Sequence, residues 1–113
     1  MTMDHLATGR LYNLPATSAE EIFTDLVASP GLRIERIVST GQATPEGTWL
    51  TQAESEFVVL VAGAARLSFA DPPRVLDMHP GDWVDIPAHC RHRVDWTHET
   101  QATVWLAVHR RDG

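Results

Sequence analysis

From residue 32 onward, the chain is a series of short β-prone runs separated by turn residues, and this pattern constrains its fold more than any other feature. Proline and glycine mark the breaks, as at Asp71-Pro72-Pro73 and His79-Pro80-Gly81. Seven or eight such runs at nearly regular spacing predict an all-β antiparallel sandwich or barrel. The strands are expected over residues 32–39, 48–52, 57–62, 65–70, 74–78, 83–86, 92–96 and 102–109.

A short helix is expected before these strands. The segment from Ser18 to Glu21 matches a capping box, in which the serine hydroxyl and the glutamate carboxylate satisfy amides of the first turn. Four apolar residues follow at helical spacing, and Pro30-Gly31 ends the element. Those four residues are Ile22, Phe23, Leu26 and Val27. The predicted organisation is an N-terminal segment, residues 1–31, whose helix packs on the sheet, and a β domain, residues 32–113.

The bulk composition is that of one compact domain and argues against two classes of partner. With 113 residues, 43% of them hydrophobic and 21% charged, the chain can enclose one core but not two. A formal net charge of −6 argues against nucleic acid and against a membrane surface as partners. A single cysteine excludes an internal disulfide, and no stretch has the length of a membrane span or the pattern of a signal peptide. These features predict a cytoplasmic protein.

Two spaced motifs lie within the β domain. In the first, Glu56 precedes an apolar strand and is followed seven residues later by Gly63. In the second, Gly81, Pro87 and His92 are spaced as glycine, five residues, proline, four residues, histidine. The two motifs resemble those of the cupin superfamily, whose members are small β-barrels that hold a metal ion or a small ligand inside. The resemblance implies a small single-domain cupin, with a jelly-roll-like antiparallel β-barrel.

The first motif departs from the family pattern at its metal ligands. In cupins it carries a His-x-His pair, which strand alternation directs to the barrel interior, followed by a glutamate. Counted back from Glu56, the two histidine positions fall on Leu50 and Gln52. An amide oxygen is a weak ligand for transition metals, and a leucine side chain offers none. Two of the usual ligands that the resemblance implies are therefore missing.

The second motif supplies one histidine at the family position and another close to it. The resemblance directs His92 into the barrel, and imidazole is the commonest metal-binding side chain. His89 replaces the glycine that normally takes a positive φ in this turn. A substitute site of Gln52, Glu56, His89 and His92 could hold a divalent transition metal, namely iron, manganese, nickel, copper or zinc. The alternative is that His89 only shapes the turn.

Aromatic residues near the two motifs complete the predicted pocket. Trp49 and Trp96 adjoin the motif regions, so we expect them to line the pocket together with Leu50. The alternative is that the tryptophans fill the core, which is the default position of large aromatic side chains. Mostly apolar walls with a few converging polar groups are the general form of a small-molecule site.

Three functions are compatible with this pattern. The first is a metal-binding cupin that acts on or binds a small organic molecule, as an oxidoreductase or an isomerase. The second is a metal-free isomerase or lyase in which Glu56 and His92 form a catalytic acid–base pair. The third is a binding or sensing module without turnover. The family resemblance and the exposed edges of a small β-sheet protein also imply a homodimer.

Overall fold

The computed structural model describes residues 6–111, which form eight β-strands and contain no helix, and hence none that could cross a membrane. The strands are β1 (Ile22–Ser29), β2 (Leu32–Ser39), β3 (Ser55–Ala62), β4 (Ala65–Ala70), β5 (Pro73–Met78), β6 (Trp83–Ile86), β7 (His92–Thr97) and β8 (Thr103–Arg110). Seven of the eight predicted strands are confirmed within one or two residues. The exception is the run at 48–52, where Leu50 makes only an isolated bridge to His92.

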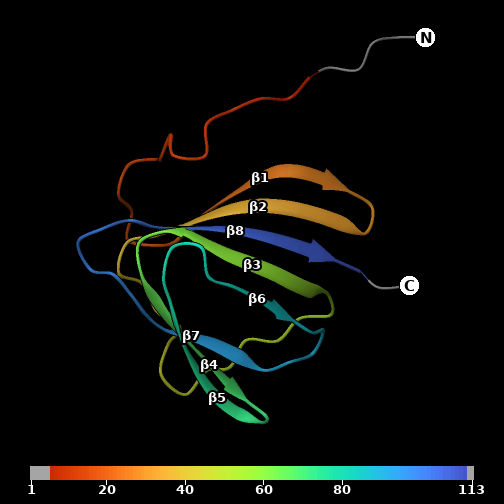
Figure 1. Cartoon of the computed structure of the whole chain (residues 1–113), viewed down its shortest axis with the longest axis vertical. Coiled ribbons are helices and arrows are strands. Elements are labelled where there is room, and N and C mark those ends of the chain that lie inside the picture. The colour runs from red at the N-terminus through yellow and green to blue at the C-terminus, as the bar shows by residue number, and fades with distance from the viewer. Residues whose placement is uncertain (1–5, 112–113) are drawn as a thin grey trace.

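The strands form two antiparallel sheets that lie on opposite sides of the molecule (Figure 1). The larger sheet has the order β1-β2-β8-β3-β6, and the smaller has the order β5-β4-β7. The predicted closed barrel is not supported, because no continuous ladder joins the two sheets within residues 6–111. β6 and β7 are consecutive, but β6 pairs with β3 and β7 pairs with β4. The fold of this part of the chain is therefore an open two-sheet arrangement.

The core lies between the two sheets and is built from alternate residues of each strand. In β3, Val58 and Leu60 are 3% and 0% exposed, and Trp105 of the neighbouring β8 is 4% exposed. Leu67 of β4 and Met78 of β5 pack into the same cluster from the smaller sheet. Removing these side chains from water is the main force that holds the two sheets together.

The predicted N-terminal helix is wrong, because the segment forms the edge strand β1, which pairs with β2. The two strands are joined by a tight turn at Pro30-Gly31, in which Gly31 has a φ of 78°. The register of β1 shifts between Asp25 and Val27, so Leu26 is an extra residue in the ladder. This bulge interrupts the two-residue alternation of a strand and gives the apolar residues a spacing that resembles a helix.

The chain before β1 is irregular and is held against the outer face of the larger sheet. Arg36 of β2 donates hydrogen bonds from Nη1 to the carbonyl oxygens of Leu11 and Asn13, each 3.1 Å away. The hydroxyl of Tyr12 donates to the carbonyl oxygen of Val61 at 3.2 Å. Since Arg36 points outward, the residues that alternate with it in β2 face the interior.

Gly63, the glycine of the first motif, forms the turn between β3 and β4 at a point where a larger residue does not fit. Its φ is 88°, a conformation that residues with a Cβ rarely adopt. A Cβ here would lie 2.5 Å from the Cα of Thr103 and 2.8 Å from the carbonyl oxygen of Ala102. The hydroxyl of Thr103 also donates to the carbonyl of Ala64 at 3.1 Å. The end of β3 is therefore packed tightly against the start of β8.

Replacing Gly63 with alanine is expected to lower the free energy of unfolding by about 2–4 kcal/mol, because a clash with β8 adds to the cost of a left-handed alanine. Gly47→Ala is the matched control, since Gly47 has a φ of 80° but open space around its Cβ position. That variant should lose only about 1 kcal/mol. Urea denaturation measures both values, and equal losses would show that the contact with Thr103 is unimportant.

Candidate functional site

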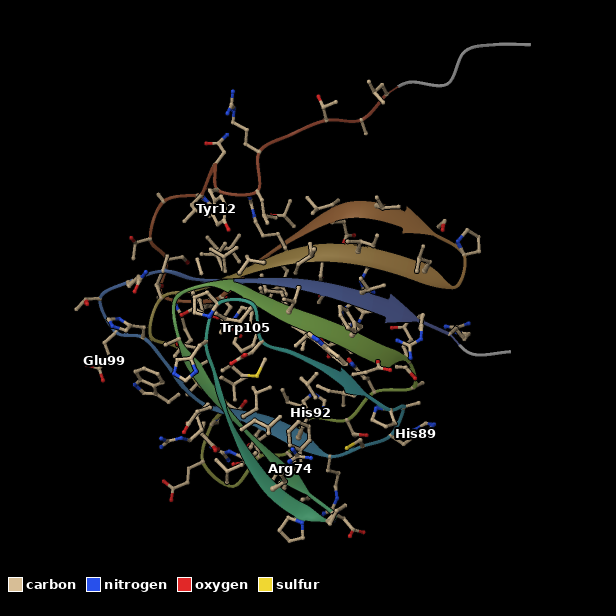
Figure 2. The ribbon with its side chains drawn as sticks, viewed as in Figure 1. Tyr12, Arg74, His89, His92, Glu99 and Trp105 are labelled. Atoms are coloured by element: carbon tan, nitrogen blue, oxygen red, sulfur yellow. The ribbon has the colours of Figure 1, made fainter. Side chains whose placement is uncertain are left out.

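A cavity of about 380 Å³ is lined by residues of both sheets. Its walls are mostly apolar and include Val58, Leu67, Ile86 and Trp105. Figure 2 shows Trp105 and His92 in the space between the sheets. The polar lining consists of eight residues: Glu21, Arg33, Glu35, Thr51, Gln52, Glu56, His92 and His109.

The register of the larger sheet places three of these polar residues side by side. His109 of β8 pairs with Glu56 of β3 on one side and with Arg33 of β2 on the other. Side chains paired across neighbouring strands point to the same face, with Cβ atoms about 5 Å apart. Arg33, His109 and Glu56 thus form a polar row on the inner face, and the next inward residues along β3 and β8 are apolar.

Glu56 is the point at which the two sequence motifs meet. It is 9% exposed, and its Oε1 accepts a hydrogen bond of 2.8 Å from Nε2 of Gln52. His92 comes from the smaller sheet, and its Nε2 lies 4.0 Å from the same carboxylate oxygen. Two side chains that are far apart in the sequence are therefore brought together inside the protein.

Backbone groups fix the orientation of His92. Its amide donates to the carbonyl of Leu50 at 3.0 Å, and its carbonyl accepts from the Leu50 amide at 2.7 Å. Nδ1 of the ring lies 2.9 Å from the carbonyl oxygen of Cys90, which can only accept, so Nδ1 carries a proton. In the neutral imidazole, Nε2 is then the unprotonated nitrogen, available on the side of Glu56 to take a proton.

A second glutamate–histidine pair lies in the same cavity. Nε2 of His109 lies 2.7 Å from Oε1 of Glu35, and the two residues are 4% and 7% exposed. Oε2 of Glu35 is 3.9 Å from Nε of Arg33. Nδ1 of His109 is buried and has no hydrogen-bond partner among the residues that the structure describes. Desolvation offsets much of the attraction in such a pair, so its presence beside a cavity is more typical of a functional site than of a stabilising element.

The cavity brings together four of the seven predicted site residues. Leu50, Gln52, Glu56 and His92 all line it. Leu50 and Gln52 come from the segment before β3, and the bridge from Leu50 to His92 holds this segment against the start of β7. The catalytic and metal-binding roles of these residues stay predictions.

His89 lies outside the lining, at the turn between β6 and β7 and well away from Trp105 (Figure 2). Its φ is 66°, so the histidine keeps the left-handed conformation of the glycine that it replaces. The side chain is exposed, and the backbone amide donates to the carbonyl of Gln52 at 2.7 Å. These contacts favour the alternative in which His89 shapes the turn.

Trp49 and Trp96 are also not among the residues that line the cavity, and they are 39% and 38% exposed. For Trp96 the cause is a bulge, because the register between β7 and β4 skips Asp95. The extra residue reverses the alternation, so Val94 faces the cavity whereas Trp96 does not. Without the bulge, strand alternation would place Val94 and Trp96 on the same face.

Glu35, His109 and Trp105 line the cavity but were not predicted from the sequence. A signal was present for two of them, since Trp105 and His109 share one face of a strand by alternation. For Glu35 the signal was ambiguous, because β2 carries buried side chains on both faces. The chain before β1 covers the outer face of β2. The apolar residues of β2 therefore do not show which of its faces points inward.

The side chains present do not fit the metal centre that the family resemblance implies. Only Glu56 and His92 offer ligands at the family positions, and Gln52 directs its N–H groups toward Glu56. Over residues 6–111, no group of three or more histidine, cysteine, aspartate or glutamate side chains is arranged to hold a metal ion. Catalytic zinc sites, for example, use three protein ligands, so the ligand set here is incomplete.

Removing one partner of the Glu35–His109 pair is expected to destabilise the fold, because the other polar group is left buried alone. His109→Leu should lower the free energy of unfolding by about 3 kcal/mol. The double variant Glu35→Leu/His109→Leu should recover most of that loss, since neither polar group remains. Urea denaturation of both single variants and the double variant measures the coupling between the two residues. If the losses of the single variants simply add up to that of the double variant, the coupling is contradicted.

Solved structures similar to this chain share its fold. A protein of Ralstonia eutropha JMP134, described as a candidate mannose-6-phosphate isomerase, is 44% identical, with a TM-score of 0.88 over 93% of this chain and 98% of its own. A cupin superfamily protein of Desulfitobacterium hafniense DCB-2 is 17% identical, with a TM-score of 0.74 over 90% and 87% of the two chains. The iron(II) form of HppE is 17% identical, with a TM-score of 0.65 over 79% of this chain and 49% of HppE.

No protein-family model and no curated protein matches the chain. The two structures at 17% identity show the fold alone. The Ralstonia protein is related more closely, at 44% identity over nearly the whole of both chains. Together with the two motifs and the meeting of Glu56 and His92 between the sheets, these similarities establish the family: the chain is a member of the cupin superfamily.

Proposed function

We propose that this cupin binds a small organic molecule in the cavity and catalyses proton transfer on it, with Glu56 and His92 as the acid–base pair. The observation that carries the proposal is the approach of these side chains from opposite sheets, with 4.0 Å between Nε2 and Oε1. Glu56 is 9% exposed and His92 is 6% exposed. Titratable side chains that converge in a cavity are typical of catalytic acids and bases.

The separation of the pair leaves room for a ligand atom. At 4.0 Å, Nε2 of His92 and Oε1 of Glu56 are too far apart for a direct hydrogen bond. A ligand oxygen between them can lie about 2.8 Å from both, which is the ordinary length of such bonds. One side chain can then remove a proton from the ligand while the other donates one. An isomerisation that moves a proton between neighbouring carbon and oxygen atoms requires both steps.

Gln52 and Cys90 act as positioning residues in this proposal. The amide of Gln52 donates to Oε1 of Glu56 and limits the directions in which the carboxylate can turn. The carbonyl of Cys90 accepts the Nδ1 proton of His92 and so keeps Nε2 available. The same carbonyl stabilises the imidazolium that forms when Nε2 takes a proton.

The Ralstonia relative supports the isomerase form of the proposal. Its description names an isomerase, and isomerisation of a carbonyl compound can proceed by proton transfer at neighbouring atoms. The relative's substrate is not carried over to this chain, because the description concerns that protein alone. HppE, which shares the fold, contains iron(II) in its structure. Metal binding by this chain stays a prediction.

The proposal predicts that the protein exchanges carbon-bound protons of small carbonyl compounds for solvent deuterium. Dihydroxyacetone, aminoacetone and mannose are suitable probes, followed by proton NMR in deuterium oxide. Glu56→Gln and His92→Asn should each slow the exchange about 100-fold or more, because each removes one proton-transfer group. His89→Asn is the matched control, since this exposed histidine lies outside the cavity and asparagine tolerates its positive φ.

Each contrary outcome of this assay favours a different function. Unchanged exchange in Glu56→Gln and His92→Asn would remove the pair from the chemistry. Loss of exchange after dialysis against a chelator, with recovery on addition of iron, manganese, nickel, copper or zinc, would favour a metal-dependent cupin. Ligand-induced stabilisation without exchange of any probe would favour a binding module.

We also propose that the protein forms a homodimer through β1. This strand is the edge of the larger sheet, so one side of its backbone has no neighbouring strand in the described chain. Three of its apolar side chains, Phe23, Leu26 and Val27, are 58%, 44% and 47% exposed. Two copies of such an edge, related by a twofold axis, can pair with each other and cover these side chains.

Sedimentation equilibrium is expected to give a mass about twice the 12.5 kDa of one chain. Leu26→Lys should shift the equilibrium toward monomer, because it places a charge in the apolar contact. Val75→Lys is the control, since Val75 is 59% exposed but lies on β5 in the other sheet. A monomeric wild-type protein, or equal effects of the two lysine variants, would contradict dimerisation through β1.

A further inference from the structure

The charged side chains around the cavity are mostly negative. Glu21, Glu35 and Glu56 contribute carboxylates, whereas Arg33 is the one arginine or lysine among the described residues that line it. Nε of Arg33 lies 3.9 Å from Oε2 of Glu35 and 3.9 Å from Oδ1 of Asp25. Neither contact is a hydrogen bond, and Nε of Arg33 is buried without an acceptor among the described residues. Because the described lining contains three glutamates and one arginine, it keeps an excess of negative charge.

The histidines of the lining do not reverse this balance. His92 uses its Nδ1 proton on the carbonyl of Cys90, and His109 uses its Nε2 proton on Glu35. Nδ1 of His109 has no partner in residues 6–111, although His109 is only 4% exposed. In the neutral ring this nitrogen is an acceptor, and a buried acceptor without a donor costs free energy. Nδ1 of His109 therefore lacks a hydrogen-bond donor among the described residues.

Most of the polar groups occupy one end of the cavity, whereas Glu21 lies at the other end, where the hydroxyl of Ser39 donates a hydrogen bond to its carboxylate. The row of Arg33, His109 and Glu56 crosses the larger sheet near the start of β3 and the end of β8. Farther along the same strands, Val58 and Trp105 line the cavity. A ligand with a polar group at the row would place the remainder of its surface against apolar side chains.

We propose that the ligand of this cavity is a small organic amine with an apolar body, whose ammonium group binds among Glu35, Glu56 and His109. The inference rests on the proposed function, since it assigns a substrate class to the same cavity. An ammonium group donates three hydrogen bonds and accepts none, which suits two carboxylates and an unpartnered imidazole nitrogen. The acid–base pair would then act on atoms close to the amine, because Glu56 belongs to both groups.

An anionic ligand does not suit this lining. At the polar row, a phosphate or carboxylate group would meet the carboxylates of Glu35 and Glu56, and Arg33 already lies 3.9 Å from two carboxylates. Bringing like charges together in a partly desolvated cavity is strongly unfavourable. The sugar phosphate in the description of the Ralstonia relative is therefore not the class of ligand that this cavity favours.

The test compares three probes that share one apolar body and differ in charge. Cyclohexylmethylamine is a cation at pH 7, cyclohexylmethanol is neutral, and cyclohexanecarboxylate is an anion. Each is titrated into the full-length protein in the presence of a chelator. The indole N–H signal of Trp105, assigned with a Trp105→Phe variant, reports on the cavity because this side chain lines it. The amine should bind about tenfold more tightly than the alcohol, and the carboxylate most weakly.

Charge-removing variants locate the preference within the cavity. Glu35→Gln and Glu56→Gln should each reduce the advantage of the amine over the alcohol about threefold or more, because each removes one carboxylate. Glu46→Gln makes the same change in net charge at an exposed loop position and should leave the ratio unchanged. Two cavity variants are used so that the test survives if one of them does not fold.

The outcomes separate this inference from the proposed function. Binding of the alcohol or the carboxylate as tightly as the amine would overturn the assignment to an amine but leave the acid–base role standing. Tighter binding of mannose 6-phosphate than of mannose, or no shift of the Trp105 signal with any probe, would overturn it as well. Failure of the acid–base role appears separately, as unchanged deuterium exchange in Glu56→Gln and His92→Asn.

Discussion

The position of β8 between β2 and β3 is the constraint on which the site depends. Its register pairs His109 with both Glu56 and Arg33 and turns Trp105 toward the same interior. A slip of β8 by one residue would direct His109 and Trp105 to the opposite face. The close contact of Gly63 with the start of β8 and the burial of Trp105 both oppose such a slip, so packing far from the polar row keeps that row in place.

His92 completes the acid–base pair from the other sheet, and its distance from Glu56 is therefore set by how the two sheets pack. Val58 and Leu67, one from each sheet, belong to the cluster that sets this spacing. Protein interiors are packed densely enough that a change of one methylene group in such a cluster is felt by its neighbours. The 4.0 Å separation is thus a property of the core as much as of the two side chains.

Much of the fold was predictable from the residues, and two of the failures have a common cause. Seven of the eight strands in the described chain follow from local composition and spacing. The segment around Leu26 was taken for a helix, and Trp96 was expected in the pocket. Each error arises from one extra residue in a ladder, at Leu26 in β1 and at Asp95 in β7. A bulge exists only relative to the partner strand, so local spacing does not reveal it.

For the site, the amino-acid sequence was enough to select Glu56 and His92 and to show that Leu50 and Gln52 stand where the family has histidines. Those conclusions rest on the order of residues and on the resemblance of the two motifs to those of cupins. The pairing of Glu35 with His109 emerged only from the assembled sheets, because alternation tells which residues of a strand share a face but not which face lies inside. In β2 that choice depends on the chain before β1, which covers the outer face through Arg36 and leaves Glu35 to the cavity.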